Sequence, residues 1–390
     1  MTMCIDFSIF YAYRLRYINN LFILALISFG GCMPYQVPLL PLPDEANLET
    51  VAVLKQCNVA SRRLAELKGA AQSIPNEAIL ISALTLQEAK DSSAVENIVT
   101  THDELYKANL FGSYIKNPAA KEVRNYSLAL RTGFGQVRKN SIIRLIDILD
   151  IQESLEKNRA GLRKLPGTDL KNEKTGEVVY TPPQDAVQIE ALTSNLVTYI
   201  NTDDLSPLDP LVKMAIIHHQ LESIHPFYDG NGRTGRIINI LYLVAKGLLD
   251  IPILYLSRYI ITNKAEYYGQ LQNVRESGNW EPWLIFMLKG VEETSLETTK
   301  LIAEIKKLMM NYKYRLRSEL PKIYSQDLLN NMFKYPYTKI DFVMKDLQVS
   351  RVTASKYLEQ LVSHNFLIKN KLGVNNYYIN PPLFKILLGD

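Results

Sequence analysis

The chain has 390 residues, more than one ordinary domain needs, and 47% of them are apolar, so two or three domains with real cores are expected. Its 44 Lys and Arg against 40 Asp and Glu leave a formal net charge of +4, which is too small to require a nucleic-acid partner. Cys4, Cys32 and Cys57 match neither a metal-ligand spacing nor a disulfide framework, which favours a reducing compartment.

The N-terminal segment, residues 1–32, is similar to a secretion signal. Two arginines precede an apolar run over residues 21–29, and a Gly-Gly-Cys sequence ends at Cys32. The run is too short to span a bilayer securely, and its end is similar to a lipoprotein cleavage site. The alternative is that translation begins at Met33 and that residues 1–32 are upstream sequence. No other run predicts a stable membrane span.

Helices are predicted for most of the region that follows. A Pro-rich lead-in over residues 33–45 precedes apolar residues at three- and four-residue spacing from Leu48 to about Leu162, which is the pattern of amphipathic helices. We expect an N-terminal helical region over residues 33–130 and a helical core over residues 131–318.

A small β-hairpin is predicted inside this core, at residues 161–183. The segment GLRKLPGTDLKNEKTGEVVYTPP holds turn residues at 166–167 and 174–176 and a strand-like piece at 178–180. Short strands bounded by Pro and Gly turns are typical of hairpins. Helical patterns resume at Asp185.

Two apolar helices are predicted to flank one unusual turn. LVKMAIIHHQLESI (211–224) and RIINILYLVAKGLL (236–249) are apolar on nearly all sides, as expected of buried helices. Between them, HPFYDGNGRTGR (225–236) combines a histidine, an acid, three glycines and two arginines. Burying such charges without a partner is costly, so we expect the turn to bind a ligand.

The turn has the features of an anion site. Gly230, Gly232 and Gly235 let the backbone approach a ligand. The helix that opens here has unpaired amides and a partial positive charge at its start. Arg233 and Arg236 lie three residues apart, so both project near that start, and arginine forks suit phosphate oxygens.

Two further side chains predict chemistry on a phosphate. Asp229 would repel phosphate unless a cation lay between them, and Mg²⁺ typically takes one or two carboxylates plus phosphate oxygens. His225 has an ordinary pKa of about 6.5, which lets it deprotonate an attacking hydroxyl. Each feature alone is more often structural, but their combination favours Mg²⁺ with a polyphosphate. The P-loop, dinucleotide-binding and H-E-x-x-H zinc motifs are absent.

The turn resembles the Fic family motif H-x-F-x-[DE]-G-N-G-R-x-x-R and matches it at every defined position. Fic proteins are mainly α-helical, and most transfer AMP from ATP–Mg²⁺ to a Ser, Thr or Tyr hydroxyl of a protein. The resemblance implies that the hairpin is a flap that docks a target protein by strand addition. It implies these roles: His225 as general base, Phe227 as packing residue, Asp229 as Mg²⁺ ligand, Gly230, Asn231 and Gly232 as anion hole, Gly235 as part of the phosphate-binding turn, and Arg233 and Arg236 as ligands of the distal phosphates.

A second segment, DSSAVENIVT (91–100), resembles the family's inhibitory pattern [ST]-x-x-x-E-[GN]. Ser92, Glu96 and Asn97 stand in its defined places. The resemblance implies that Glu96 pairs with Arg236, which occupies the arginine and repels phosphate. The alternative is an ordinary Ser N-cap with a surface glutamate.

The last region, residues 319–390, is predicted to hold a winged helix-turn-helix. Residues 339–381 have the pattern of a helix, a tight turn, a second helix and two short strands around Gly373. Arg351 and Lys356 lie toward the start of the second helix, where such helices face DNA. The modest charge leaves a protein partner or a second subunit open.

We therefore expect a mainly α protein with a Fic-type core, a hairpin flap and a C-terminal winged helix. Its predicted function is protein adenylyl transfer with ATP and Mg²⁺, self-inhibited by Glu96, in the cytoplasm, where ATP and targets are found. One alternative is a DNA-binding regulator whose core senses nucleotide, against which the intact His225 argues. Another is an enzyme that removes AMP, with Glu96 positioning water. Homo-oligomerisation is left open.

Overall fold

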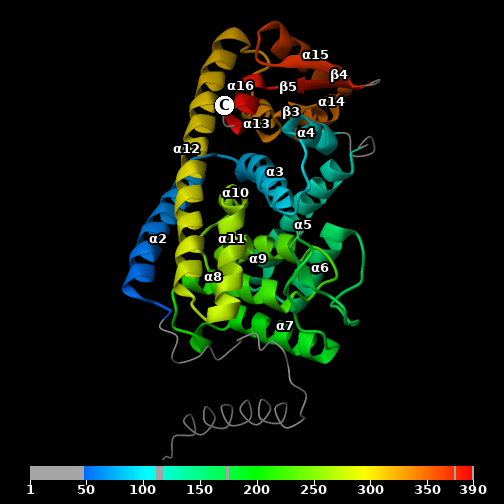
Figure 1. Ribbon diagram of the computed structural model, residues 1–390. Coiled ribbons are helices and arrows are strands. Elements are labelled where there is room, and N and C mark those ends of the chain that lie inside the picture. Colours follow the sequence, from blue (N-terminus) through cyan, green and yellow to red (C-terminus); the bar gives the residue numbers. More distant parts are fainter. Residues whose placement is uncertain (1–47, 111–116, 173–174, 373–374, 389–390) are drawn as a thin grey trace, which may run out of the picture. The chain divides into compact units, whose positions relative to one another are not determined.

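The computed structural model describes residues 48–110, 117–172, 175–372 and 375–388. The signal-like segment at 1–32 and the lead-in at 33–45 lie outside the described residues. In the part of the chain that the structure describes, no helix is long and apolar enough to cross a membrane. Helices dominate, and the strands form two small sheets (Figure 1), so the predicted fold class is confirmed.

The N-terminal helices begin at polar caps. Side chains of Thr50, Asn76 and Asn117 accept hydrogen bonds from the first turns of their helices, as N-cap residues do. The second of these helices is buried on nearly all sides, and its buried residues include the charged Glu88 and Asp91. The helices are α2 (Val51–Gln72), α3 (Glu77–Val95), α4 (His102–Leu110), α5 (Pro118–Asn140) and α6 (Leu145–Glu156).

The predicted hairpin is present. Strand β1 (Leu170–Lys171) pairs antiparallel with β2 (Val178–Tyr180), and Leu170 lies opposite Tyr180. The Tyr180 ring is buried, and its hydroxyl donates to the Ser223 carbonyl at 2.9 Å. The hairpin therefore packs against the helix that ends at the predicted catalytic turn.

The core helices include the two buried ones expected on either side of the motif. The first of them, α8, packs against α7 and α12, and the second, α9, packs against α5 and α6, while the long helix α12 runs beside α2 (Figure 1). The elements are α7 (Ala186–Asn201), the short 3₁₀ helix η2 (Asp203–Leu205), α8 (Pro210–Ile224), α9 (Asn231–Ala245), α10 (Leu256–Thr262), α11 (Lys264–Ser277) and α12 (Glu281–Glu319).

The C-terminal module has the predicted order of helix, turn, helix and two strands. Its three strands form one antiparallel sheet in the order β3-β5-β4. An added helix and strand precede this order, and a final helix follows it. The elements are α13 (Gln326–Lys334), β3 (Tyr337–Thr338), α14 (Ile340–Leu347), α15 (Arg351–Ser363), β4 (Ile368–Leu372), β5 (Asn375–Ile379) and α16 (Pro381–Leu388).

The C-terminal module contacts the helices on both sides of the predicted inhibitory segment. The Gln87 amide of α3 donates to the Leu387 carbonyl of α16. The Tyr337 hydroxyl donates to Asp103 of α4 at 2.8 Å. Helices that the predicted domain boundaries would separate pack against one another in the structure. The boundaries expected from the sequence therefore stay predictions.

Candidate active site

The predicted turn joins α8 to α9 and begins with a residue in an uncommon conformation. His225 caps α8 in the left-handed region, with φ 49° and ψ 56°, and its amide donates to the Leu221 carbonyl at 2.9 Å. Ending the helix in this way turns the chain toward the α9 N-terminus. The His225 side chain lines a cavity there.

The turn is held in shape by one side chain. The Asn231 amide oxygen accepts from the Phe227 backbone N–H, and its amide nitrogen donates to the Phe227 carbonyl, both at 2.8 Å. Phe227 is fully buried, which agrees with the packing role that the resemblance implies. Because the Asn231 side chain is engaged inside the turn, its backbone N–H is the group left for a ligand.

The start of α9 is open to the cavity. Gly230 caps this helix at φ 80° without a side-chain cap bond, a conformation that glycine adopts readily. A Cβ on Gly232 would overlap the carboxylate of Glu96. The first amides of a helix lack partners within it, so an anion can bind here. Gly235 lies further along α9, packed against His218.

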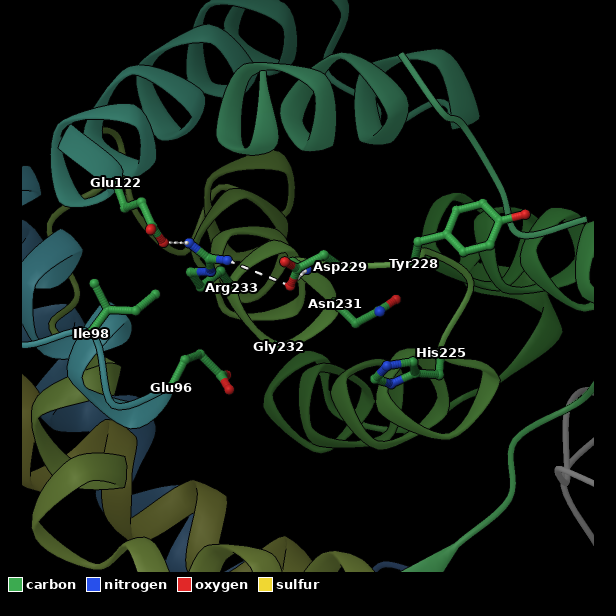
Figure 2. Close-up of a pocket in the computed structure, with 10 residues that line it drawn as sticks. Glu96, Ile98, Glu122, His225, Tyr228, Asp229, Asn231, Gly232 and Arg233 are labelled. Atoms are coloured by element: carbon green, nitrogen blue, oxygen red, sulfur yellow. Dashed lines mark hydrogen bonds and ion pairs between the residues drawn. The ribbon is translucent and has the colours of Figure 1, made fainter. Parts of the chain in front are cut away.

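The cavity has a volume of about 390 Å³ and gathers predicted residues from distant segments (Figure 2). Figure 2 shows His225 on one side and Glu96 with Ile98 on the other, with Arg233 and Asp229 between them. Its lining residues are Glu96, Ile98, Glu122, His225, Tyr228, Asp229, Gly230, Asn231, Gly232 and Arg233.

Arg236 is brought together with the predicted inhibitory segment. Its side chain is 1% exposed and donates to Glu96 at 2.8 Å. It also donates to the Ser92 hydroxyl at 2.8 Å and the Ser92 carbonyl at 2.9 Å. Burial favours the neutral forms, but mutual attraction outweighs it, so the pKa of Arg236 is raised and that of Glu96 is lowered. The exposed Asn97 follows in the left-handed region.

Arg233 is surrounded by three acidic side chains, of which the sequence predicted only Asp229. Its guanidinium lies 3.1 Å from Glu122, 2.9 Å from Glu156 and 3.7 Å from Asp229. Burial raises the pKa of Glu156, and the nearby acids add to this against the attraction of Arg233. Glu122 and Glu156 come from α5 and α6, and no local pattern marks them in the sequence.

His225 is tuned toward its neutral form. Burial is the largest cause, and the charges of Arg163 and Arg275 add to it, so the pKa of His225 falls to about 4. The charge of Glu96 and the backbone carbonyl of Glu222, which accepts from the imidazole ring, oppose this shift. A neutral imidazole near pH 7 can accept a proton.

Asp229 is the carboxylate best placed for a cation. Its side chain is 76% exposed and lines the cavity next to the open helix start. Over the described ranges, no group of three or more His, Cys, Asp and Glu side chains could hold a metal by itself. An exposed carboxylate beside an anion site suits Mg²⁺, which takes few protein ligands and completes its shell with phosphate oxygens and water.

Most of the chain matches models of known protein families. Residues 54–135 match the "Fic/DOC family N-terminal" profile, and residues 142–243 match "Fic/DOC family". Residues 308–383 match "Protein adenylyltransferase SoFic-like, C-terminal domain".

Individual relatives are similar over part of their length. "Protein adenylyltransferase fic-1" of Caenorhabditis elegans is 30% identical over 149 residues, which is 37% of this chain and 28% of the relative. "Protein adenylyltransferase Fic" of Aedes aegypti is 27% identical over 158 residues, which is 40% of this chain and 30% of the relative. The chain thus spans less than a third of the length of these relatives.

A solved structure has the same fold. A Fic family protein from Desulfovibrio desulfuricans superposes with a TM-score of 0.53 at 19% identity, covering 85% of this chain and 96% of that one.

Proposed function

The chain belongs to the Fic/DOC family, and on that premise we propose that it is a protein adenylyltransferase. It would move AMP from ATP to a Ser, Thr or Tyr hydroxyl of another protein. One observation carries the proposal: His225 lines the same cavity as the open start of α9, Asp229 and Arg233. A base, an anion site and a cation ligand in one cavity are the groups that transfer of a phosphoryl-type group needs.

The proposed reaction is one displacement at the α-phosphorus. His225 takes the proton of the target hydroxyl, whose oxygen forms a bond to phosphorus. The bond between the α-phosphorus and the bridging oxygen breaks, and pyrophosphate leaves. The backbone amides of Gly230, Asn231 and Gly232 stabilise the charge on the transferred group, that of Gly230 after leaving the Asp229 carboxylate to which it donates, and Arg233 and Arg236 bind the leaving phosphates. Asp229 would hold Mg²⁺, which neutralises phosphate charge when bound.

Glu96 is proposed as an inhibitor of this reaction. It occupies Arg236 at 2.8 Å, and its carboxylate reaches the space beside Gly232. A phosphate needs the same guanidinium and the same helix start. The carboxylate both competes for these groups and repels a phosphate that approaches them.

The flap is proposed to dock the target chain. Each strand of the two-stranded sheet has one edge that pairs with no other described strand, and Val178 and Val179 of β2 are exposed. The Gln272 side chain of α11 donates to the Val179 carbonyl on this edge at 3.2 Å, and a target segment would replace that bond. An extended target segment would add to this edge through backbone hydrogen bonds, which tolerate varied sequences. The proposed reaction uses ATP and target proteins, so we propose that it takes place in the cytoplasm.

The C-terminal module is proposed as a docking module, with DNA as one partner. Arg351 and Lys356 on α15, and Lys369 and Lys371 on β4, are exposed. Arg351 pairs with Asp341 at 3.1 Å, and Lys369 pairs with Glu359 at 2.7 Å. A duplex that binds here should shift in a gel at low salt and be released as salt rises. No shift at low salt would favour a protein partner or a second copy of the chain.

The proposal is tested by labelled ATP. The chain is incubated with Mg²⁺ and ATP labelled on the α-phosphate, and separately on the γ-phosphate, as wild type, Glu96→Gly and His225→Ala in the Glu96→Gly background. We expect α label only, at least about tenfold stronger in Glu96→Gly, since loss of one charged hydrogen bond is worth about 1.5–3 kcal/mol. His225→Ala should lower transfer by about 10²–10⁴-fold.

Controls separate the proposal from its alternatives. Glu66→Gly changes an exposed helical glutamate of α2 and should leave labelling unchanged. If ATP binds but no variant incorporates label, the chain is a nucleotide-sensing regulator instead. If the chain removes AMP from a modified protein, and Glu96→Gly abolishes that removal, the role of Glu96 in positioning water replaces the inhibitory one.

A further inference from the structure

We propose that Arg163 is a positioning residue that links the flap to the catalytic base. The inference rests on the proposed function, since it assigns a second part of the same reaction. Arg163 precedes β1 at the base of the flap and was not singled out by any sequence pattern.

The burial of Arg163 demands an explanation. Its side chain is 0% exposed, and within the described ranges no carboxylate lies within ion-pair distance of it. An unpaired buried charge is costly. Burial accordingly lowers the pKa of Arg163. The fold retains a costly group here, so its hydrogen bonds have to supply something that an apolar side chain cannot.

Those bonds go to the carbonyls that end helix α8. The Arg163 Nε donates to the His225 carbonyl at 2.7 Å, and Nη2 lies 3.5 Å from the Ile224 carbonyl. The last carbonyls of a helix have no partner within it, and they favour a cation. Arg163 thus caps the helix whose C-cap residue is the proposed base, and it bonds the left-handed backbone of His225.

The same guanidinium holds the other end of the flap. Nη2 donates to the Pro183 carbonyl at 2.8 Å, just beyond β2. The Arg163 backbone N–H donates to the Pro226 carbonyl at 2.7 Å. One side chain therefore joins the residues before β1, the residues after β2 and the carbonyl of the base.

A second contact ties the flap to the turn. The Tyr228 hydroxyl accepts from the backbone N–H groups of Lys164 at 3.0 Å and Leu165 at 3.2 Å. The base of the flap is thus bonded to the turn twice, through Arg163 and through Tyr228. A target segment paired with the flap would then have its hydroxyl in fixed register with His225, and misplacement by about 1 Å can cost about 10²-fold in rate.

Arg163 also acts on His225 through its charge. The groups that act on the pKa of His225, besides burial, are Arg163, Arg275 of α11, Glu96 after α3 and the Glu222 backbone. Burial and the two arginines lower it. Removing the Arg163 charge should therefore raise the pKa of His225, whereas lysine, which keeps the charge, should not.

The kinetic test compares Arg163→Gln and Arg163→Lys in the Glu96→Gly background. Both should lower kcat about 10–100-fold with the KM for ATP within about twofold, because alignment and not nucleotide binding is lost. Arg159→Gln is the matched control, since Arg159 is 86% exposed and its ion-pair partner among the described residues is Glu153. Unchanged kcat in both Arg163 variants would overturn the proposal, and so would a loss confined to the KM for ATP.

A second readout needs no transfer activity, so it stands if the proposed function fails. The chain has five histidines, and the His225 ring signal is assigned by its loss in His225→Ala. In NMR titrations, Arg163→Gln should raise the pKa of His225 above about 4, and Arg163→Lys should leave it low. Amide exchange should quicken together in the flap and in the turn. Unchanged titration and unchanged exchange would overturn the link, and Arg163→Lys decides if Arg163→Gln does not fold.

Discussion

His225, the proposed base, shows at the scale of one residue how burial sets the pH range over which a base can act. The base must be neutral to accept a proton, and its pKa of about 4 lies below the usual 6.5. Lowering the pKa of a base extends its activity to lower pH. We expect kcat/KM of the Glu96→Gly variant to stay level through pH 6 and to fall only toward pH 4. Circular dichroism at each pH verifies folding, and an acid limb centred at 6.5 would contradict the prediction.

Gly232 tests whether the helix start needs a bare backbone. Its missing Cβ leaves room that the Glu96 carboxylate now fills. If phosphate uses the same room, Gly232→Ala should lower transfer at least about tenfold even when Glu96 is glycine, because the closest amides become shielded. Gly69→Ala, in open space on α2, is the matched control. Full transfer by the double variant would mean that Gly232 only accommodates Glu96.

At the scale of elements, α3 is fixed by a buried carboxyl. Glu88 accepts from the Tyr126 hydroxyl of α5 at 3.0 Å and from the Ser257 N–H of α10 at 3.1 Å. Burial raises the pKa of Glu88 to about 7 despite these bonds. Below pH 4.5 the Glu88 carboxyl is protonated in both the folded and the unfolded protein. Between pH 4.5 and about 7 it ionises in the unfolded protein but not in the folded one, so the free energy of unfolding falls over this range.

This difference in ionisation predicts a pH-dependent stability. Between pH 5 and 8, the free energy of unfolding of wild type should fall relative to that of Glu88→Gln by about 1–3 kcal/mol. Urea unfolding at both pH values measures this difference, and using the difference cancels the contribution of Glu222, whose pKa burial also raises to about 7. A constant gap between the two proteins would show that Glu88 stays ionised.

The elements also show what the sequence could predict. The turn from His225 to Arg236 is contiguous, so its spacing reveals both the anion site and the helices around it. The inhibitory segment was found through a resemblance, and the structure brings Glu96 to Arg236. Glu122, Glu156 and Arg163 reach the same region from other elements. Only tertiary packing puts them there, and their local patterns are those of ordinary surface charges.

At the scale of the whole molecule, the C-terminal module contacts the helices on both sides of the proposed inhibitory segment. The buried Gln87 side chain joins the Leu387 carbonyl to the His102 ring, so it bridges α16, α3 and α4. Gln87→Ala removes these bonds, each worth about 0.5–1.5 kcal/mol. We expect it to raise basal transfer by up to about tenfold, since 1.4 kcal/mol is tenfold in a population. The effect should vanish in the Glu96→Gly background, and an equal effect there would refute the coupling.

Glu96 closes α3 as its C-cap, and its side chain is 34% exposed although most of the helix before it is buried. The ion pair between Glu96 and Arg236 can therefore break by a rotamer change at the rim of the cavity without unfolding of α3, while Ser92 still holds Arg236 through its hydroxyl and carbonyl. The inhibition proposed for Glu96 would then be incomplete. Linkage between two ligands of one guanidinium is reciprocal: ATP displaces the carboxylate as effectively as the carboxylate excludes ATP. If Glu96 inhibits as proposed, the basal transfer rate should rise with the concentration of ATP.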